Sequence, residues 1–300
     1  MSAVHLPDGL TQRPLRLEDA EAVFDVMVAQ EQQDLDEVMI ELADIVGDWS
    51  RASFDVAAST VGVFDGEQLV AYGEVGAHGR CDAAVRPDHR GRGIGTAIAR
   101  WMQELGRQRG IAEIGMPVPK GSPGDRLLAS LGYRVRWESW GLELPAGAVI
   151  ANRPLPAGYG VRPADPSDYE QCWTVQEDAF LEWSQREREP YDEWVAAMTG
   201  RPGFEPWNLR VVVDAAGEVA SFCWVQLGEE SAFIARLATR ADQRGRGLAQ
   251  ALLVDAFAAA RARGATRSEL STDSRTGALG LYEKVGMVVT STWVNRGIAL

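Results

Sequence analysis

The chain has 300 residues, 46% of them hydrophobic and 24% charged, with a formal net charge of −13. The apolar fraction suffices for two hydrophobic cores, and the negative charge argues against a nucleic acid partner because it repels phosphate backbones. The sequence has no apolar run of about 18 residues and, in residues 1–14, no basic segment followed by an apolar core. We therefore expect a globular, cytoplasmic protein without a membrane partner.

The first half of the chain is expected to alternate strands and helices. The expected elements before a glycine-rich segment are a strand at 14–17, helices from 19 onward, a hairpin over 61–75 and a strand at 81–85. After that segment, apolar residues recur at helical spacing from Ile94 to Leu105, which predicts an amphipathic helix packed on the sheet. Pro117, Pro119 and Pro123 follow, and we expect them to break the next strand.

The second half follows the same plan: one strand, two helices, three strands, a helix, a strand, a short helix and closing strands. The expected ranges are 161–164, 169–180, 189–198, 209–213, 219–227, 232–239, 248–263, 268–272, 277–284 and, for the closing strands, 288–299. Between the halves, three prolines and two glycines in residues 145–159 interrupt any regular period. We interpret 145–159 as a linker between an amino-terminal domain, 1–144, and a carboxy-terminal domain, 160–300.

Three cysteines, Cys81, Cys172 and Cys223, lie far apart in the sequence. An odd number of widely separated cysteines, two of them with apolar or aromatic neighbours, favours small buried side chains over disulfides. No pair of cysteines or histidines has the spacing of a zinc site, so we expect no metal.

The two halves share one motif. Arg90-Gly-Arg-Gly-Ile-Gly95 recurs 154 positions later as Arg244-Gly-Arg-Gly-Leu-Ala249, and an offset of 146 pairs Gln30 with Gln176. A repeat whose copies lie about 150 residues apart, a usual domain size, indicates two similar domains. Glycines just before a helix allow an anion to approach unpaired N–H groups, so each copy predicts a phosphate site.

The spacing decides which phosphate motif this is. Neither copy continues to the Gly-Lys-Ser/Thr of a P-loop, and Thr96 and Gln250 stand where a dinucleotide-binding motif has its third glycine. The remaining pattern is Arg-x-x-Gly-x-Gly/Ala. Together with residues 84–89 before it and Gly277-Ala-Leu-Gly-Leu-Tyr-Glu-Lys-Val-Gly-Met287, it resembles the GNAT superfamily of acyl-CoA N-acyltransferases. The resemblance implies an α/β fold of two tandem domains, each a mixed, splayed sheet flanked by helices.

The resemblance also implies that coenzyme A, as acetyl-CoA, is held by the two loops and by the strands before them. Loop amides would meet its pyrophosphate, and strand amides its pantetheine and thioester. The residues so implied are Ala83, Val85, Arg90, Gly91, Arg92, Gly93, Ile94 and Gly95 in the first half, and Leu237, Ala238, Thr239, Arg244, Gly245, Arg246, Gly247, Leu248 and Ala249 in the second.

Tyr282 matches the general acid of the family. Its phenol, with an ordinary pKa of about 10, is protonated at neutral pH and able to donate to a departing thiolate; the competing interpretation is an aromatic side chain packed under its helix. The equivalent position in the first half is Leu128, which cannot donate a proton. We therefore expect the carboxy-terminal domain to be catalytic. The amino-terminal domain is expected to be degenerate in its chemistry, and either binds coenzyme A or is purely structural.

An amine must lose a proton before it attacks, and Glu177, with Glu229 and Glu230 as alternatives, is the predicted proton acceptor. In the same acidic, aromatic stretch as Glu177, the residues expected to bind the acceptor are Asp178, Glu182 and Trp183. Carboxylates would attract a cationic amine, and the indole would offer a flat apolar face. Surface solvation and core packing are the competing interpretations of these side chains.

We expect an N-acetyltransferase that moves an acetyl group from acetyl-CoA to the amine of a small molecule by direct attack, as a monomer or homodimer. Mycothiol synthase is one tandem member of the superfamily. An acceptor of that kind, a peptide or protein amine, or an amine acetylated for detoxification all stay open. The contrasting hypothesis is a non-catalytic acyl-CoA sensor or interaction module.

Overall fold

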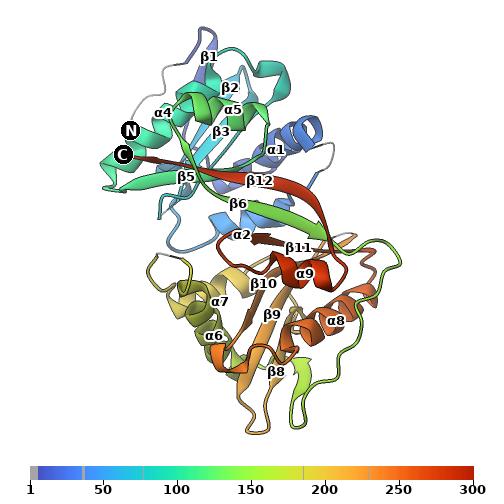
Figure 1. Cartoon of the computed structure of the whole chain (residues 1–300). Helices are drawn as coiled ribbons and strands as arrows, with labels where there is room; N and C mark the ends of the chain where they lie inside the picture. Colours follow the sequence, from blue (N-terminus) through green and yellow to red (C-terminus); the bar gives the residue numbers. More distant parts are fainter. Residues whose placement is uncertain (1–5, 36–37, 77, 185, 229) are drawn as a thin grey trace. The chain divides into compact units, whose positions relative to one another are not determined.

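The computed structural model describes residues 6–35, 38–76, 78–184, 186–228 and 230–300. The chain divides into two compact units: unit 1 holds residues 1–138 and 292–300, and unit 2 holds residues 139–291. Each unit packs helices on both faces of a β-sheet, so the predicted α/β class is confirmed (Figure 1). No helix within the described ranges is long and apolar enough to cross a membrane.

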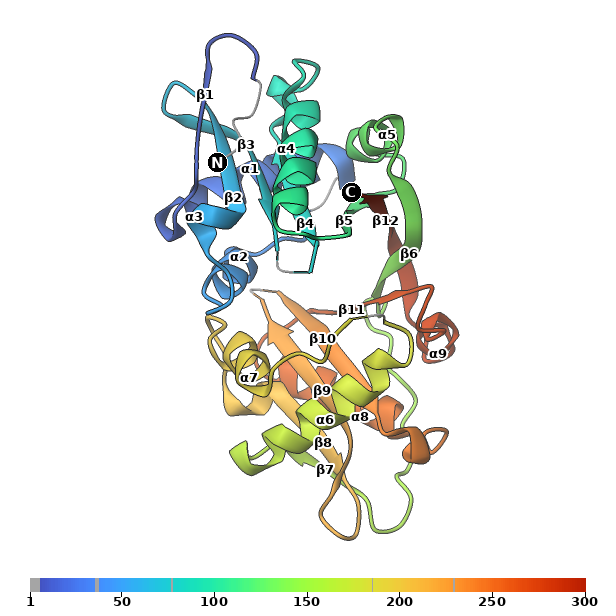
Figure 2. The ribbon, with the colours of Figure 1, turned by 90° about the vertical axis from the view of Figure 1, so that its left-hand side faces the viewer.

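Unit 1 is built on an antiparallel sheet in the order β1-β2-β3-β4. Its elements are β1 Leu10–Arg13, α1 Ala20–Leu35, α2 Leu42–Trp49, α3 Val56–Ser59, β2 Thr60–Asp65, β3 Gln68–Val75, β4 Cys81–Val85, α4 Ile94–Gln108, β5 Glu113–Pro119 and α5 Pro123–Ser130. Helix α4 covers one face of the sheet, and α1 and α2 cover the other (Figure 2). Ile98 and Met102 on α4, and Val23 and Val26 on α1, fill the two interfaces.

The first strand lies earlier than expected. Strand β1 occupies Leu10–Arg13, and the predicted strand at 14–17 is instead a connection that ends in a short turn before α1. Pro14 has no N–H with which to continue a strand ladder. The Asp19 carboxylate accepts a hydrogen bond from the Arg16 backbone N–H at 2.8 Å, which fixes the turn.

Strands β4 and β5 meet only near their starts. A parallel bridge joins Arg80 to Gly115, and beyond it β5 pairs with β12 (Val288–Ala299), from Glu113 opposite Ala299 to Pro119 opposite Trp293. The two parallel strands therefore separate, and one edge of each stays open.

Pro117 and Pro119 lie within β5, so the predicted break of this strand is wrong. The Gly115 N–H donates to Gly79 O on the side away from β12, and Pro117 and Pro119 have the same parity along the strand. Their nitrogens therefore face the open edge, where no ladder hydrogen bond is needed. Proline is tolerated at such an edge.

The strands of unit 2 follow the order β7-β8-β9-β10-β11-β6, with β6 at Arg134–Glu143, in an eight-stranded sheet that continues from β6 through β12 to β5. The other elements of unit 2 are β7 Gly160–Pro163, α6 Tyr169–Leu181, α7 Tyr191–Thr199, β8 Leu209–Val213, β9 Val219–Leu227, β10 Ser231–Thr239, α8 Leu248–Arg261, β11 Arg267–Asp273 and α9 Leu279–Lys284. Helix α8 packs on one face through Leu252 and Phe257, and α6 and α7 surround Phe222 on the other (Figure 2). The predicted order is found, except that one strand, β12, closes the chain.

The closing strands of the two repeats are exchanged between the units. Strand β12 starts in unit 2, yet its residues 293–299 pair with β5 in unit 1 (Figure 1). Strand β6 (Arg134–Glu143) starts in unit 1, yet its residues 139–143 pair with β11 in unit 2. The predicted limits, 1–144, 145–159 and 160–300, describe the sequence repeats and stay a prediction, because each compact unit includes segments from beyond them.

Replacing Val294 by Asp should lower the free energy of unfolding by about 3 kcal/mol, because this β12 side chain is 2% exposed and an unpaired charge would be buried. Hydrogen exchange should become faster in β4 and β5 and stay unchanged in β8 and β9. Val288→Asp, at a 48% exposed position of the same strand, is the matched control and should have little effect. Faster exchange confined to unit 2 would contradict the exchanged topology.

Candidate functional site

Each unit carries a glycine loop directly before a long helix. In unit 1, Gly91 and Gly93 have φ of 77° and 87°, and Gly93 is the N-cap of α4. In unit 2, Gly245 and Gly247 have φ of 76° and 83°, and Gly247 is the N-cap of α8. Glycine adopts this left-handed backbone without steric cost. The unpaired N–H groups of the first helical turn and the positive end of the helix dipole make each loop fit to hold a phosphate.

Open space lies beside three of these glycines. A Cβ atom added to Gly91, Gly93 or Gly245 would have no neighbouring atom within 4 Å. At Gly247, a Cβ atom would lie 2.7 Å from Arg153 Cδ and 2.9 Å from Arg153 Nε. The Arg153 side chain therefore lies over the unit 2 loop.

Arg153 is a candidate site residue that the sequence did not reveal. It belongs to the segment interpreted as a linker, and Gln250 Nε2 of α8 ties this segment down by donating to Ala151 O at 2.7 Å. The available signal was weak: Arg153 is the one charged residue among residues 145–159. Its guanidinium places positive charge beside the amides that would meet a phosphate.

The first arginine of each loop is bound to a carboxylate from the preceding helix region. Arg90 donates to Asp34 of α1 at 2.8 and 2.9 Å, and Arg244 donates to Glu182, which follows α6, at 2.7 and 2.6 Å. Each guanidinium also donates to the last carbonyl of the strand before its loop. These arginines therefore hold the loop in position, and part of their charge is balanced within the protein.

The edge of β10 opens at a bulge. Its pairing with β9 shifts register between Ile234 and Arg236, and β11 pairs with β10 only as far as Ile234. Farther along, the Arg240 N–H donates to a β9 carbonyl, so the N–H groups of Leu237 and Thr239 point to the open edge. A ligand that extended from the loop along β10 would therefore find two hydrogen-bond donors for its carbonyl oxygens. The side chain of the intervening predicted residue, Ala238, is buried in the core on the α6 side.

In unit 1 the equivalent edge is occupied by side chains. The Ala83 N–H donates to Asp82 Oδ1 at 2.8 Å, and the Val85 N–H donates to Gln30 Oε1 at 3.2 Å. Both N–H groups point away from β3, because the Arg86 N–H, of opposite parity, donates to a β3 carbonyl.

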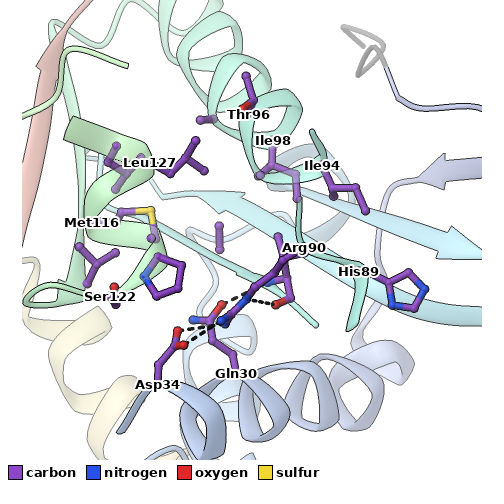
Figure 3. Close-up of a pocket in the computed structure, with 18 of the residues that line it drawn as sticks. Gln30, Asp34, His89, Arg90, Ile94, Thr96, Ile98, Met116, Ser122 and Leu127 are labelled. Carbon is purple, nitrogen blue, oxygen red and sulfur yellow. Dashed lines mark hydrogen bonds and ion pairs between the residues drawn. The ribbon is translucent and has the colours of Figure 1, made fainter. Parts of the chain in front are cut away.

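A cavity of about 430 Å³ lies between the loop, α4, β5 and α5 of unit 1. Figure 3 shows Gln30 and Asp34 reaching toward Arg90 from one side, with Ile98, Met116 and Leu127 on the other. The predicted residues that line the cavity are Ala83, Val85, Arg90, Gly91, Gly93, Ile94 and Gly95. The structure thus brings the first-half residues together, apart from Arg92, whose side chain lies 3.6 Å from Asp65.

Tyr282 lies on α9 and is only 7% exposed. Burial raises the pKa of its phenol to about 12, so the phenol keeps its proton at neutral pH. Leu128, its predicted counterpart on α5, is 4% exposed and lines the unit 1 cavity. The role of Tyr282 as general acid stays a prediction.

Glu177 is fully buried, and its carboxylate has several donors. Arg186 donates to both oxygens at 2.7 Å, and the Glu189 N–H donates at 2.9 Å. Burial acts to raise the pKa of Glu177, but these donors bring it below its ordinary value. The geometry therefore favours an anchor for the segment after α6 over a proton acceptor. Glu229 lies outside the described residues, and Glu230 is exposed.

The three predicted acceptor residues contact arginines of unit 2. Asp178 pairs with Arg188, Glu182 pairs with the first loop arginine, and the Arg275 guanidinium lies 4.7 Å from the centre of the Trp183 ring. Each of the three side chains thus already contacts an arginine, and an amine substrate would have to compete with these contacts. Their role in binding stays a prediction.

Cys81, Cys172 and Cys223 are buried free thiols, as the sequence indicated. Burial raises the pKa of the Cys81 thiol to about 12, so it stays protonated and unreactive. In the part of the chain that the structure describes, no three His, Cys, Asp or Glu side chains are grouped to hold a metal ion.

The acetyltransferase (GNAT) family profile matches the chain twice, over residues 21–133 and 168–287. The mycothiol acetyltransferases of Salinispora arenicola and Salinispora tropica are 30% and 31% identical over 231 residues, 71% of each chain. A GCN5-related N-acetyltransferase structure from Sphaerobacter thermophilus is 26% identical, with a TM-score of 0.76 over 98% of this chain and 96% of that one. A tandem GNAT protein from the clavulanic acid biosynthesis pathway, 17% identical, shares the fold with a TM-score of 0.73 over 97% of this chain and 98% of that one.

Arg153→Ala should weaken binding of coenzyme A to unit 2 by about three- to tenfold, because an exposed guanidinium adds a modest charge-assisted contact to a phosphate. The difference should shrink at high salt. Calorimetric titration at two salt concentrations measures both effects, with Arg261→Ala, at the far end of α8, as the matched control. Unchanged or tighter binding would show that Arg153 covers the loop without serving the ligand.

Proposed function

Because this chain belongs to the acetyltransferase (GNAT) family, we propose that unit 2 transfers an acetyl group from acetyl-CoA to the amine nitrogen of a small molecule. The observation that carries this proposal is the coincidence of three features in one unit. They are a glycine loop at a helix N-terminus, a strand edge with two outward N–H groups, and a buried phenol that keeps its proton.

The phosphates would lie against the amides of residues 244–249, with the exposed Arg246 and Arg153 nearby. From there the pantetheine arm would follow the open edge of β10. The Leu237 and Thr239 N–H groups would then donate to carbonyl oxygens of the pantetheine and the thioester. A preorganised donor at the thioester oxygen stabilises the negative charge that develops there during acyl transfer.

The proposed chemistry is a direct attack without a covalent enzyme intermediate. The lone pair of the neutral amine forms a C–N bond to the acetyl carbon, the C–S bond breaks, and the thiolate takes a proton from Tyr282. The nitrogen loses its extra proton to water or to a carboxylate. Glu177 was predicted for that role, but its contacts with Arg186 support a structural one. Water is therefore the proposed proton acceptor.

Unit 1 is proposed to bind coenzyme A without transferring an acetyl group. The residues that line its cavity, and the open glycines of its loop, support binding. Leu128 supplies no proton, and both outward amides of β4 are already bonded to side chains. These features support a division of labour between two units of one fold.

The acceptor side of unit 2 is proposed to include Asp178, Glu182 and Trp183, which follow one another at and beyond the end of α6. Two relatives are named mycothiol acetyltransferase, so an amine of that type is the first acceptor to test. Other small amines and peptide amines follow. If acetyl-CoA binds but no amine releases free thiol, the alternative of a non-catalytic acyl-CoA-binding protein holds instead.

Tyr282→Phe should lower kcat at neutral pH by about 100-fold, because the departing thiolate loses its proton donor. The affinity for acetyl-CoA should stay the same, since the ring remains. Thiol release with an amine panel measures kcat. Tyr133→Phe is the matched control, because Tyr133 is a 3% exposed tyrosine of unit 1 whose pKa burial also raises to about 12. Equal rates for wild type and Tyr282→Phe would remove Tyr282 from the mechanism.

A further inference from the structure

The two units carry opposite charges at one equivalent position. Asp82 in unit 1 and Arg236 in unit 2 are 154 positions apart, the same offset as the two glycine loops. Each directly precedes the residue whose N–H points to the open strand edge, Ala83 in one unit and Leu237 in the other. A ligand lying along the edge therefore meets the carboxyl group of Asp82 in unit 1, with Arg80 as a charged neighbour of that group, and the guanidinium of Arg236 in unit 2.

The Asp82 carboxylate does more than carry charge. Its Oδ1 accepts the hydrogen bond of the Ala83 N–H at 2.8 Å, so this donor is occupied by an acceptor within the protein. A thioester oxygen placed there would lose its donor and lie beside carboxylate oxygens, which repel it. A free thiol has no carbonyl oxygen to place, and its S–H is itself a weak donor that a carboxylate accepts.

Gln30 acts on the next amide in a different way. Its side-chain oxygen accepts from the Val85 N–H at 3.2 Å. This oxygen belongs to a neutral amide, as do the carbonyls of a pantetheine arm, so a ligand that displaces Gln30 replaces one hydrogen bond by another of the same kind. Gln30 would therefore weaken the binding of coenzyme A and acetyl-CoA equally, whereas Asp82 would distinguish between them.

Unit 2 differs at both positions. The Arg236 guanidinium donates to Ala235 O at the bulge, at 2.8 Å, which holds a cation next to the Leu237 amide. Gln176, the counterpart of Gln30, accepts from Trp194 Nε1 at 2.9 Å and also contacts Glu177, so it is turned to the interior. The edge of unit 2 thus suits a carbonyl oxygen that gains negative charge.

We propose that unit 1 is a site for coenzyme A in its free thiol form, and that Asp82 makes it discriminate against the acetyl thioester. This inference rests on the proposed binding of coenzyme A to the unit 1 loop. Unit 1 would then bind the product of the reaction that unit 2 carries out, and the two sites of one chain would select the two states of one cofactor.

The test uses the full chain with Gly247→Asp, which places a carboxylate at the unit 2 loop and leaves unit 1 as the site for phosphates. Calorimetric titration then compares coenzyme A with acetyl-CoA. Coenzyme A should bind more tightly by about five- to tenfold, the size of one buried hydrogen bond lost to an unsatisfied acceptor. Adding Asp82→Asn removes the charge but leaves an oxygen that can still accept from the Ala83 N–H, so it should reduce the preference for coenzyme A to about two- to threefold.

Two further variants separate the inference from general effects on unit 1. Gln30→Ala should strengthen binding of both ligands and leave their ratio unchanged, which also tests the site if Asp82→Asn is unstable. Glu104→Gln removes an exposed charge from α4, near Arg107, and should change neither affinity.

The outcomes distinguish this inference from the proposed function. Equal affinities in the Gly247→Asp chain, or a ratio that Asp82→Asn does not change, would overturn the discrimination by Asp82 alone. Binding of neither ligand would overturn it together with the coenzyme A site of unit 1. In that case thiol release by the wild-type chain would still test acetyl transfer by unit 2 independently.

Discussion

Each unit depends on two parallel strands that pair at their starts and then separate. In unit 1 a bridge between Arg80 and Gly115 is followed by divergence, and in unit 2 the pairing of β10 with β11 ends at Ile234. Separation leaves backbone N–H groups without a ladder partner, and such groups must find one in water, a side chain or a ligand. The glycine loop and its helix begin at the end of one of these strands. Phosphate donors and strand-edge donors therefore face the same opening.

The two units satisfy this requirement in different ways. Unit 1 meets it internally, with Asp82 and Gln30, and leaves a cavity lined mainly by aliphatic side chains. Unit 2 keeps Leu237 and Thr239 at an open edge and binds its own glutamine to Trp194. Under the proposed function, a small number of side-chain contacts would separate a binding unit from a catalytic one of the same fold.

Local patterns in the sequence predicted the elements that local physics determines. The strands at 209–213 and 219–227 have the predicted bounds, because two short, largely apolar runs lie on either side of the turn at 214–217. Both loops were also predictable, because the same glycine-rich motif occurs twice, each time directly before a helical pattern. The strand break predicted at Pro117 and Pro119 is wrong because the partner of β5 is residues 293–299, far away in the chain, and their pairing decides which edge of β5 stays open. Contacts of this kind cannot be read from neighbouring residues.

The same limit applied to the candidate site. The contrast between Tyr282 and Leu128 is visible in the sequence, because a motif carries it. Gln30 and Gln176 match in the sequence, yet their side chains bind different partners, since the choice depends on a tryptophan from another helix. The sequence pattern also does not reveal that Arg186, nine residues after Glu177, donates hydrogen bonds to both oxygens of this predicted proton acceptor.

The exchanged strands also have a consequence for the order in which the protein is made and folds. Domains generally fold as units during synthesis, the amino-terminal one first. Here the strand that completes the sheet beside β5 is supplied by residues 293–299, which leave the ribosome after all of unit 2. Until residues 293–299 are synthesised, the edge of β5 that later pairs with β12 therefore stays unpaired. An unpaired strand edge is open to incorrect pairing. On the opposite edge of β5, Pro117 and Pro119 have no N–H to donate, which disfavours incorrect pairing there. The two prolines that predict a strand break therefore confine the exposed edge of the nascent strand to one side.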